Sequence, residues 1–120
     1  MVVDDNQDAA DMLGCILESK GHVTRIAHDG LSALEVAAEC HPDIALLDIG
    51  LPGMDGYELA RKLRAQPGAE PIFLIALTGY GQPSDRQRSF DAGFDAHLVK
   101  PVSLEQILSL IAQVPVALPA

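Results

Sequence analysis

The chain has 120 residues, 48% of them hydrophobic, which fits one folded domain and excludes a disordered chain. Its 17 acidic residues against 8 basic ones give a net charge of −9, which argues against nucleic-acid contact by this domain. No apolar stretch has membrane-spanning length and no signal peptide is visible. We therefore expect this domain to make no membrane contact and to lie in the cytoplasm, although its parent protein could be membrane-anchored.

The first half of the chain alternates apolar runs with helical patterns. In chain order we expect a strand ending at Val3, a helix over Asn6 to Lys20, a strand over His22 to Ala27, a helix over Leu31 to Cys40 and a strand over Ile44 to Leu47. The spacing in the first helix predicts a buried stripe at Ala9, Met12, Leu13, Ile16 and Leu17. Asp5 or Asn6 can cap that helix with a side-chain oxygen.

The second half continues the alternation. It predicts a helix over Gly56 to Ala65, a strand over Ile72 to Leu77, a helix over Ser84 to Ala92, a strand over Ala96 to Val99 and a helix capped by Ser103. The helix over Ser84 to Ala92 offers only Phe90 and Ala92 as apolar anchors, so it should be weakly docked.

Five strand–helix units in strict alternation predict an α/β fold, with a parallel sheet covered by helices on both faces and right-handed crossovers. We expect one domain over residues 1–113. Pro115 and Pro119 mark residues 114–120 as a tail that frays.

Asp48 closes the uncharged run at Ile44 to Leu47 and precedes a loop rich in Gly and Pro. In open α/β sheets, ligands bind in the crevice beyond the carboxyl ends of the strands, so a carboxylate there suggests chemistry. The simpler alternative is that Asp48 only turns the loop.

Other strands end in reactive side chains too. Asp4 and Asp5 follow the first strand, Thr78 the fourth and Lys100 the fifth, so a parallel sheet brings them to one edge with Asp48. Singly, each could be a helix cap, a strand-end hydroxyl or a solvated charge. Together, three carboxylates exceed the charge of one lysine, and a hard divalent cation such as Mg²⁺ would complete the balance. A carboxylate beside that cation can attack phosphorus.

The phrases VVDDN (Val2 to Asn6), LLDIGLPGMDG (Leu46 to Gly56), LTG (Leu77 to Gly79) and LVKP (Leu98 to Pro101) resemble the receiver (CheY-like) domain of two-component response regulators. The resemblance covers nearly the whole chain. It implies a flavodoxin-like, doubly wound (βα)5 fold with strand order 2-1-3-4-5. The phrases LTGYGQ and HLVKP resemble receivers attached to hybrid sensor histidine kinases, so we expect that origin over a stand-alone regulator.

The resemblance also implies roles for single residues. Asp48 would be the phosphoacceptor, and Mg²⁺ (or Mn²⁺) would be held by Asp4, Asp5, Asp48 and the backbone carbonyl of Gly50. Thr78 would be the switch hydroxyl, and Gly79 and Lys100 would contact the phosphoryl group. The Lys100–Pro101 peptide would be cis.

Three positions bear on switching and lifetime. His97 stands where many receivers carry Tyr or Phe, which puts the usual aromatic rotamer switch in doubt. Gly50 and Tyr80 occupy the positions that tune the lifetime of the phosphoryl group in this family. The remaining histidines form no ligand set and are expected at the surface: His22, His28 and His41.

As a receiver, the chain would take a phosphoryl group from a phosphohistidine on a histidine kinase or a histidine phosphotransfer domain. It would then change a surface made by the fourth helix, last strand and fifth helix, which a downstream protein or linked kinase domains would read. It would catalyse its own phosphorylation and dephosphorylation without being a free-standing enzyme.

Three other classes fit less well. A haloacid-dehalogenase-like phosphatase needs a second Asp two residues after the nucleophile, where Gly50 stands. A dinucleotide-binding fold needs a Gly-rich turn after the first strand, where Asp4, Asp5 and Asn6 stand. A degenerate receiver that only binds a partner would lack site residues that are all present here.

Overall fold

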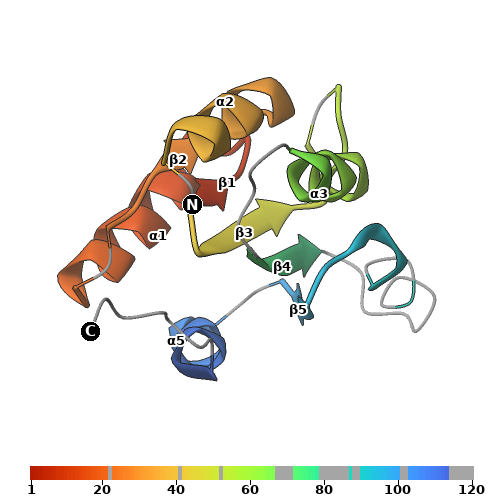
Figure 1. Ribbon diagram of the computed structural model, residues 1–120. Helices are drawn as coiled ribbons and strands as arrows, with labels where there is room; N and C mark the ends of the chain where they lie inside the picture. Colours follow the sequence, from red (N-terminus) through yellow and green to blue (C-terminus); the bar gives the residue numbers. More distant parts are fainter. Residues whose placement is uncertain are drawn as a thin grey trace, which may run out of the picture.

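The structure, a computed structural model, describes residues 1–21, 23–40, 42–51, 53–66, 72–78, 87, 90–100 and 103–113. Its strands are β1 (Val2–Val3), β2 (Ile26–Ala27), β3 (Ile44–Asp48), β4 (Phe73–Thr78) and β5 (Ala96–Val99). Its helices are α1 (Gln7–Ser19), α2 (Gly30–Cys40), α3 (Gly56–Ala65) and α5 (Leu104–Gln113) (Figure 1). Among the described residues, no helix is long and apolar enough to cross a membrane.

The strands form one sheet in the order β2-β1-β3-β4-β5, with every neighbouring pair parallel. This confirms the predicted α/β class and strand order. The longest pairing runs from Ile44 opposite Phe73 to Asp48 opposite Leu77. Parallel pairing with helical connections places every strand's carboxyl end at the same edge of the sheet.

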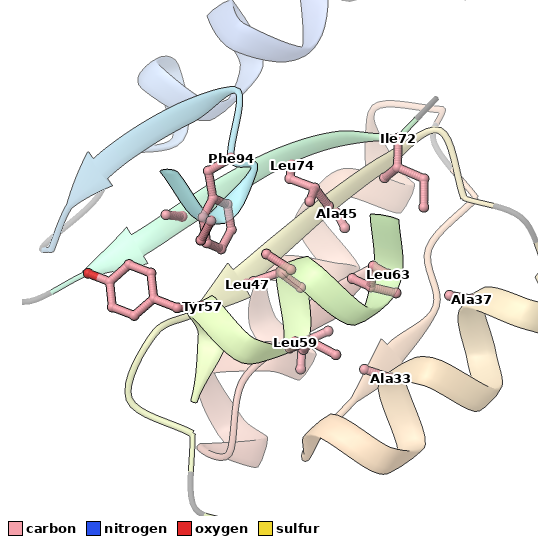
Figure 2. Close-up of a cluster of buried hydrophobic side chains, with 14 of the residues drawn as sticks. Ala33, Ala37, Ala45, Leu47, Tyr57, Leu59, Leu63, Ile72, Leu74 and Phe94 are labelled. Carbon is pink, nitrogen blue, oxygen red and sulfur yellow. The ribbon is translucent and has the colours of Figure 1, made fainter. Parts of the chain in front are cut away.

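Helices cover both faces of this sheet (Figure 1). On one face, α2 and α3 pack a cluster that includes Leu47, Leu59, Leu63 and Leu74 (Figure 2). On the other face, α1 and α5 pack a cluster that includes Leu46, Leu17, Ile75 and Ile107. Neighbouring residues of β3 therefore enter opposite clusters, and this is why its apolar run has no polar alternation.

Side-chain caps fix where three helices begin. The predicted caps are confirmed: Asn6 Oδ1 accepts from the amide of Ala9 at 3.1 Å, and Ser103 Oγ accepts from the amide of Gln106 at 3.2 Å. Asp55 Oδ1 caps α3 in the same way, through the amide of Glu58 at 2.9 Å. Each cap satisfies an amide that the first helical turn leaves without an intrahelical partner.

The predicted buried stripe of α1 is only partly right. Met12 is 65% exposed and Ala9 is also exposed, whereas Ala10, Gly14 and Leu17 are the buried residues. Small residues face the sheet because the helix approaches it closely there. A Cβ at Gly14 would lie 2.8 Å from Ile26 Cδ1.

Two other expectations change. β2 is shorter than predicted: Val23, within the predicted strand, lies outside β2 and is 89% exposed. The predicted helix over Ser84 to Ala92 lies mostly outside the described residues, so its weak docking stays a prediction. Of its two proposed anchors, Ala92 is buried but Phe90 is 54% exposed.

Candidate functional site

The residues predicted to meet at the carboxyl edge of the sheet all lie there, and the side chains of Asp4, Asp5, Asp48 and Lys100 come together. Asp48 is the last residue of β3, and Thr78, the last of β4, pairs in register with Val99. Asp4 follows β1 directly and Lys100 follows β5 directly. The convergence is therefore set by parallel pairing of strands that are far apart in the sequence.

Asp48 is buried and held through both of its carboxylate oxygens. Only 8% of the Asp48 surface is exposed. Oδ1 accepts from the amide of Gly50 at 3.0 Å, and Oδ2 lies 3.1 Å from the ammonium of Lys100. Lys100 is itself partly exposed, so solvent reaches the positive side of this contact.

Asp4 lies beside Asp48 at this edge of the sheet and is 7% exposed. Its Oδ1 accepts from the amide of Asn6 at 2.9 Å, and its Oδ2 lies 3.9 Å from Lys100 Nζ. Burial raises the pKa of Asp4. The hydrogen bond from Asn6 opposes that shift, and the nearby charge of Asp48 adds to it.

The donor set suits a hard divalent cation. Asp4, Asp5 and Asp48 each offer a carboxylate oxygen, and these oxygens all lie within 4.8 Å of one another. Oxygen ligands that include one or two carboxylates are what Mg²⁺ takes in proteins, usually with water and phosphate oxygens. Two of the three carboxylates are buried, so their mutual repulsion is weakly screened. A bound cation would relieve this repulsion, and the cluster therefore favours one.

Glycines shape the backbone behind Asp48. At Gly56, the first residue of α3, a Cβ would lie 2.7 Å from Ile49 Cα and 2.8 Å from the carbonyl oxygen of Asp48. The amide of Gly56 donates to the Ile49 carbonyl at 3.0 Å. The start of α3 therefore packs directly on the backbone of Asp48 and Ile49. At Gly50, by contrast, the one atom among the described residues that a Cβ would meet is Asp48 Oδ1, at 3.7 Å.

Thr78 and Lys100 are linked through the backbone. Thr78 is 3% exposed, and its carbonyl accepts from the amide of Lys100 at 2.7 Å. His97, at the position that departs from the family, is half-buried and pairs in register with Ala76. Gly79, Tyr80 and Pro101 lie outside the described residues, so their roles and the cis peptide stay predictions.

The sequence interpretation missed one residue at this edge. His28 was expected at the surface, but it is half-buried, and its ring Nδ1 lies 3.1 Å from the carbonyl oxygen of Asp4. That expectation is wrong, because His28 directly follows β2, which lies next to β1 in the sheet. The strand order implied by the resemblance could have signalled this neighbour. His22 and His41 lie outside the described residues.

A cavity of about 560 Å³ lies at the opposite edge of the sheet. It is lined by the chain before β2 and before β3, including Thr24, Arg25 and Asp43, and by Ile111 of α5. It contains none of the three clustered carboxylates. We therefore place the candidate functional site at the carboxyl edge of the sheet and not in this cavity.

A doubly wound parallel sheet with an acidic cluster at its carboxyl edge defines a flavodoxin-like protein of the CheY-like class. The model of the response regulator receiver domain family matches residues 1–112. The chain belongs to this family.

Individual relatives agree. The response regulator MprA of Mycobacterium ulcerans is 38% identical over 109 residues, which cover 91% of this chain and 46% of MprA. The chain thus spans about half the length of that relative. The chemotaxis protein CheY4 of Vibrio cholerae superposes with a TM-score of 0.88 at 28% identity, covering 95% of both chains. The receiver domain of the sensor histidine kinase PA1611 of Pseudomonas aeruginosa, solved with magnesium in its active-site cleft, has a TM-score of 0.83 at 29% identity. It covers 94% of this chain and 93% of its own.

Proposed function

We propose that this domain accepts a phosphoryl group on Asp48 and acts as a switch in two-component phosphorelay signalling. One observation carries the proposal. The Asp48 carboxylate is buried between the Gly50 amide and the Lys100 ammonium, and one of its oxygens lies within 4.8 Å of one carboxylate oxygen of Asp4 and one of Asp5. Such an arrangement places a nucleophile beside an ammonium that can neutralise charge on a transferred phosphoryl group, and beside two carboxylates that can hold a divalent cation.

The transfer begins when one carboxylate oxygen of Asp48 attacks the phosphorus of a phosphohistidine. A P–O bond forms on Asp48, the P–N bond breaks, and the imidazole leaves with a proton from solvent. Lys100 lies 3.1 Å from Asp48 Oδ2, so its ammonium can contact the oxygens of the incoming group. Water later attacks the phosphorus, the P–O bond to Asp48 breaks, and inorganic phosphate and a proton leave. The carboxylate is thereby restored, which makes the switch reversible.

Mg²⁺ fits this role, with Asp4, Asp5, Asp48 and the Gly50 carbonyl as its ligands. When bound, it neutralises charge on the phosphoryl oxygens. The magnesium found in the PA1611 receiver supports this assignment. The carboxylate of Asp4 is buried, and a hydrogen bond from the Asn6 amide already fixes its Oδ1.

The donor would be a histidine kinase or a histidine phosphotransfer domain. The readout would be the surface of the fourth helix, β5 and α5, biased when Thr78 moves toward the phosphoryl group. His97 would replace the usual aromatic switch residue on that surface, and Gly50 and Tyr80 would tune the lifetime. Attachment to a hybrid kinase stays a prediction.

The test is labelling by a small phosphoryl donor, acetyl phosphate, with Mg²⁺ present, followed by intact-mass measurement. Wild type should gain one phosphoryl group and Asp48→Asn none. Asp43→Asn is the matched control, since it makes the same change at the exposed amino end of the same segment. Labelling of Asp48→Asn at the wild-type rate would contradict the proposal.

Metal binding is tested separately by thermal unfolding. A ligand at ten times its dissociation constant stabilises the folded state by about 1.4 kcal/mol, which raises the melting temperature of a domain this size by several degrees. We expect that shift with millimolar Mg²⁺ for wild type and for Asp43→Asn. An equal shift for Asp48→Asn, or none for wild type, would argue against the metal site.

A further inference from the structure

We infer that His28 is a positioning residue for the acidic pair Asp4 and Asp5, because its imidazole holds the peptide group that joins them. His28 Nδ1 lies 3.1 Å from the carbonyl oxygen of Asp4. A carbonyl oxygen can only accept, so in this contact Nδ1 carries the proton and donates. The inference rests on the proposed function, since it concerns the metal site that this function needs.

The ring contributes one bond at the point where the β1–β2 ladder ends. The amide of Asp4 donates to the carbonyl of Ala27 at 3.1 Å, in line with the parallel pairing of the two strands. Beyond His28 the chain turns into α2, where Asp29 Oδ1 accepts from the amide of Ser32 at 2.7 Å. The donor to the Asp4 carbonyl is thus a side chain of β2's end rather than the strand's own backbone.

The consequence for Asp5 follows from the planarity of the peptide bond. The carbonyl of Asp4 and the amide of Asp5 belong to one rigid plane, so a bond that fixes the carbonyl also fixes the direction in which Asp5 leaves. Asp4 is then held at its amide, its carbonyl and Oδ1, while Oδ2 faces Lys100. Asp5 is exposed and relies on this plane for its place in the cluster.

Without the ring, the plane can rotate and carry the Asp5 carboxylate away from Asp4 and Asp48. Loss of a hydrogen-bonding group behind the metal ligands typically weakens metal affinity about 10- to 100-fold. The effect expected here is weaker Mg²⁺ binding with an intact nucleophile. His28→Ala should therefore act on metal affinity and not on the chemistry of Asp48.

The experiment compares three substitutions by Mg²⁺ titration, followed through amide NMR shifts of Asp48 to Gly50. The side-chain amide nitrogen of Asn falls near the position of Nδ1, whereas that of Gln lies one bond further out. We expect His28→Ala and His28→Gln to raise the Mg²⁺ dissociation constant about tenfold. His28→Asn should stay within about threefold of wild type because it keeps the donor.

Acetyl phosphate labelling at saturating Mg²⁺ provides the second readout, and it should return to the wild-type rate in His28→Ala. Wild-type affinity in His28→Ala, or an Asn variant as weak as the Gln variant, overturns the inference and leaves the proposed function standing. A labelling rate that stays low at saturating Mg²⁺ also overturns it, because the ring would then act on more than the metal pair. Failure of wild type itself to bind Mg²⁺ overturns both.

Discussion

Lys100 Nζ lies 3.1 Å from Asp48 Oδ2, although the two residues are 52 positions apart in the sequence. The same ammonium lies 3.9 Å from Asp4 Oδ2. Parallel pairing of β3, β4 and β5 creates this relationship, since each strand brings its own carboxyl end to the shared edge. Lys100 therefore serves as the counter-charge of two buried carboxylates before any phosphoryl group arrives.

Lys100→Met should slow labelling of Asp48 by acetyl phosphate about a hundredfold, the usual cost of removing one group that stabilises charge in the transition state. Methionine keeps much of the side-chain volume and removes the ammonium. The control is Lys62→Met on α3, whose exposed ammonium pairs only with Glu58 at 3.6 Å among the described residues. Equal labelling rates in the two variants would exclude a role for Lys100 in transfer.

Asp4→Asn should stabilise the protein at neutral pH when Mg²⁺ is removed by a chelator. Burial raises the pKa of Asp4 above its ordinary value of 3.8, so the folded state favours the protonated form. Between the two pKa values the folded state binds more protons than the unfolded state, and stability falls as pH rises. The asparagine keeps an Oδ1 that can accept from the Asn6 amide.

The advantage of Asp4→Asn should thus shrink as pH falls through the folded-state pKa of Asp4 and vanish below 3.8. Urea unfolding at a series of pH values measures it. Asp11→Asn, an exposed carboxylate of α1, should show no such gain. A pH-independent difference for Asp4→Asn would contradict the role of burial.

Gly56→Ala should destabilise the fold by about 1–3 kcal/mol, the cost of inserting a methyl group into a tightly packed site. Its Cβ would lie 2.7 Å from Ile49 Cα and 2.8 Å from the Asp48 carbonyl, and both are backbone atoms that cannot move alone. Gly50→Ala is the matched control, because within the described part of the chain its Cβ would meet a single oxygen, at the ordinary contact distance of 3.7 Å. Urea unfolding of both variants should separate them clearly.

Arg64→Ala should cost about 2 kcal/mol, in the range of hydrogen bonds made by charged groups. The guanidinium of Arg64 donates to the carbonyls of Gly93 and Ile72 and pairs with Asp95 Oδ2 at 2.7 Å. Asp95 in turn accepts from the amide of Leu74, so one fork ties α3 to the start of β4 and β5.

Arg64→Lys should recover little of that stability, since an ammonium lacks the planar fork. Lys62→Ala, which breaks an exposed pair on the same helix, should change stability by less than about 0.5 kcal/mol. Thermal unfolding of the three variants measures their loss of stability. A loss for Arg64→Ala as small as that for Lys62→Ala would show that the contacts of the Arg64 guanidinium do not stabilise the fold.

The sequence was most informative about regular features. The uncharged run before Asp48 predicted a strand buried on both faces, and Leu46 and Leu47 do enter opposite clusters. The helix over Gly56 to Ala65 and the strand over Ala96 to Val99 have the predicted bounds. Local pattern suffices in these cases, because an uncharged apolar run between turn residues marks a strand, and helical spacing of apolar residues marks a helix.

Sequence reasoning was least informative where two elements approach each other. It assigned Met12 to the core of α1 because methionine is apolar, yet Gly14 and Ala10 face the sheet and Met12 faces solvent. Hydrophobicity alone ranks glycine low, whereas close packing favours the smallest side chain. Only the distance between helix and sheet could reveal this preference.

The sequence by itself determined the strand-end residues Asp4, Asp48, Thr78 and Lys100, because a polar or charged residue follows each apolar run. The tertiary structure alone decided which atoms meet. It gave Lys100 two carboxylate neighbours, put the start of α3 against the carbonyl of Asp48, and brought His28 to the Asp4 carbonyl. Those contacts depend on the order and register of the strands. Register describes how two strands pair, so it cannot be read from one strand alone.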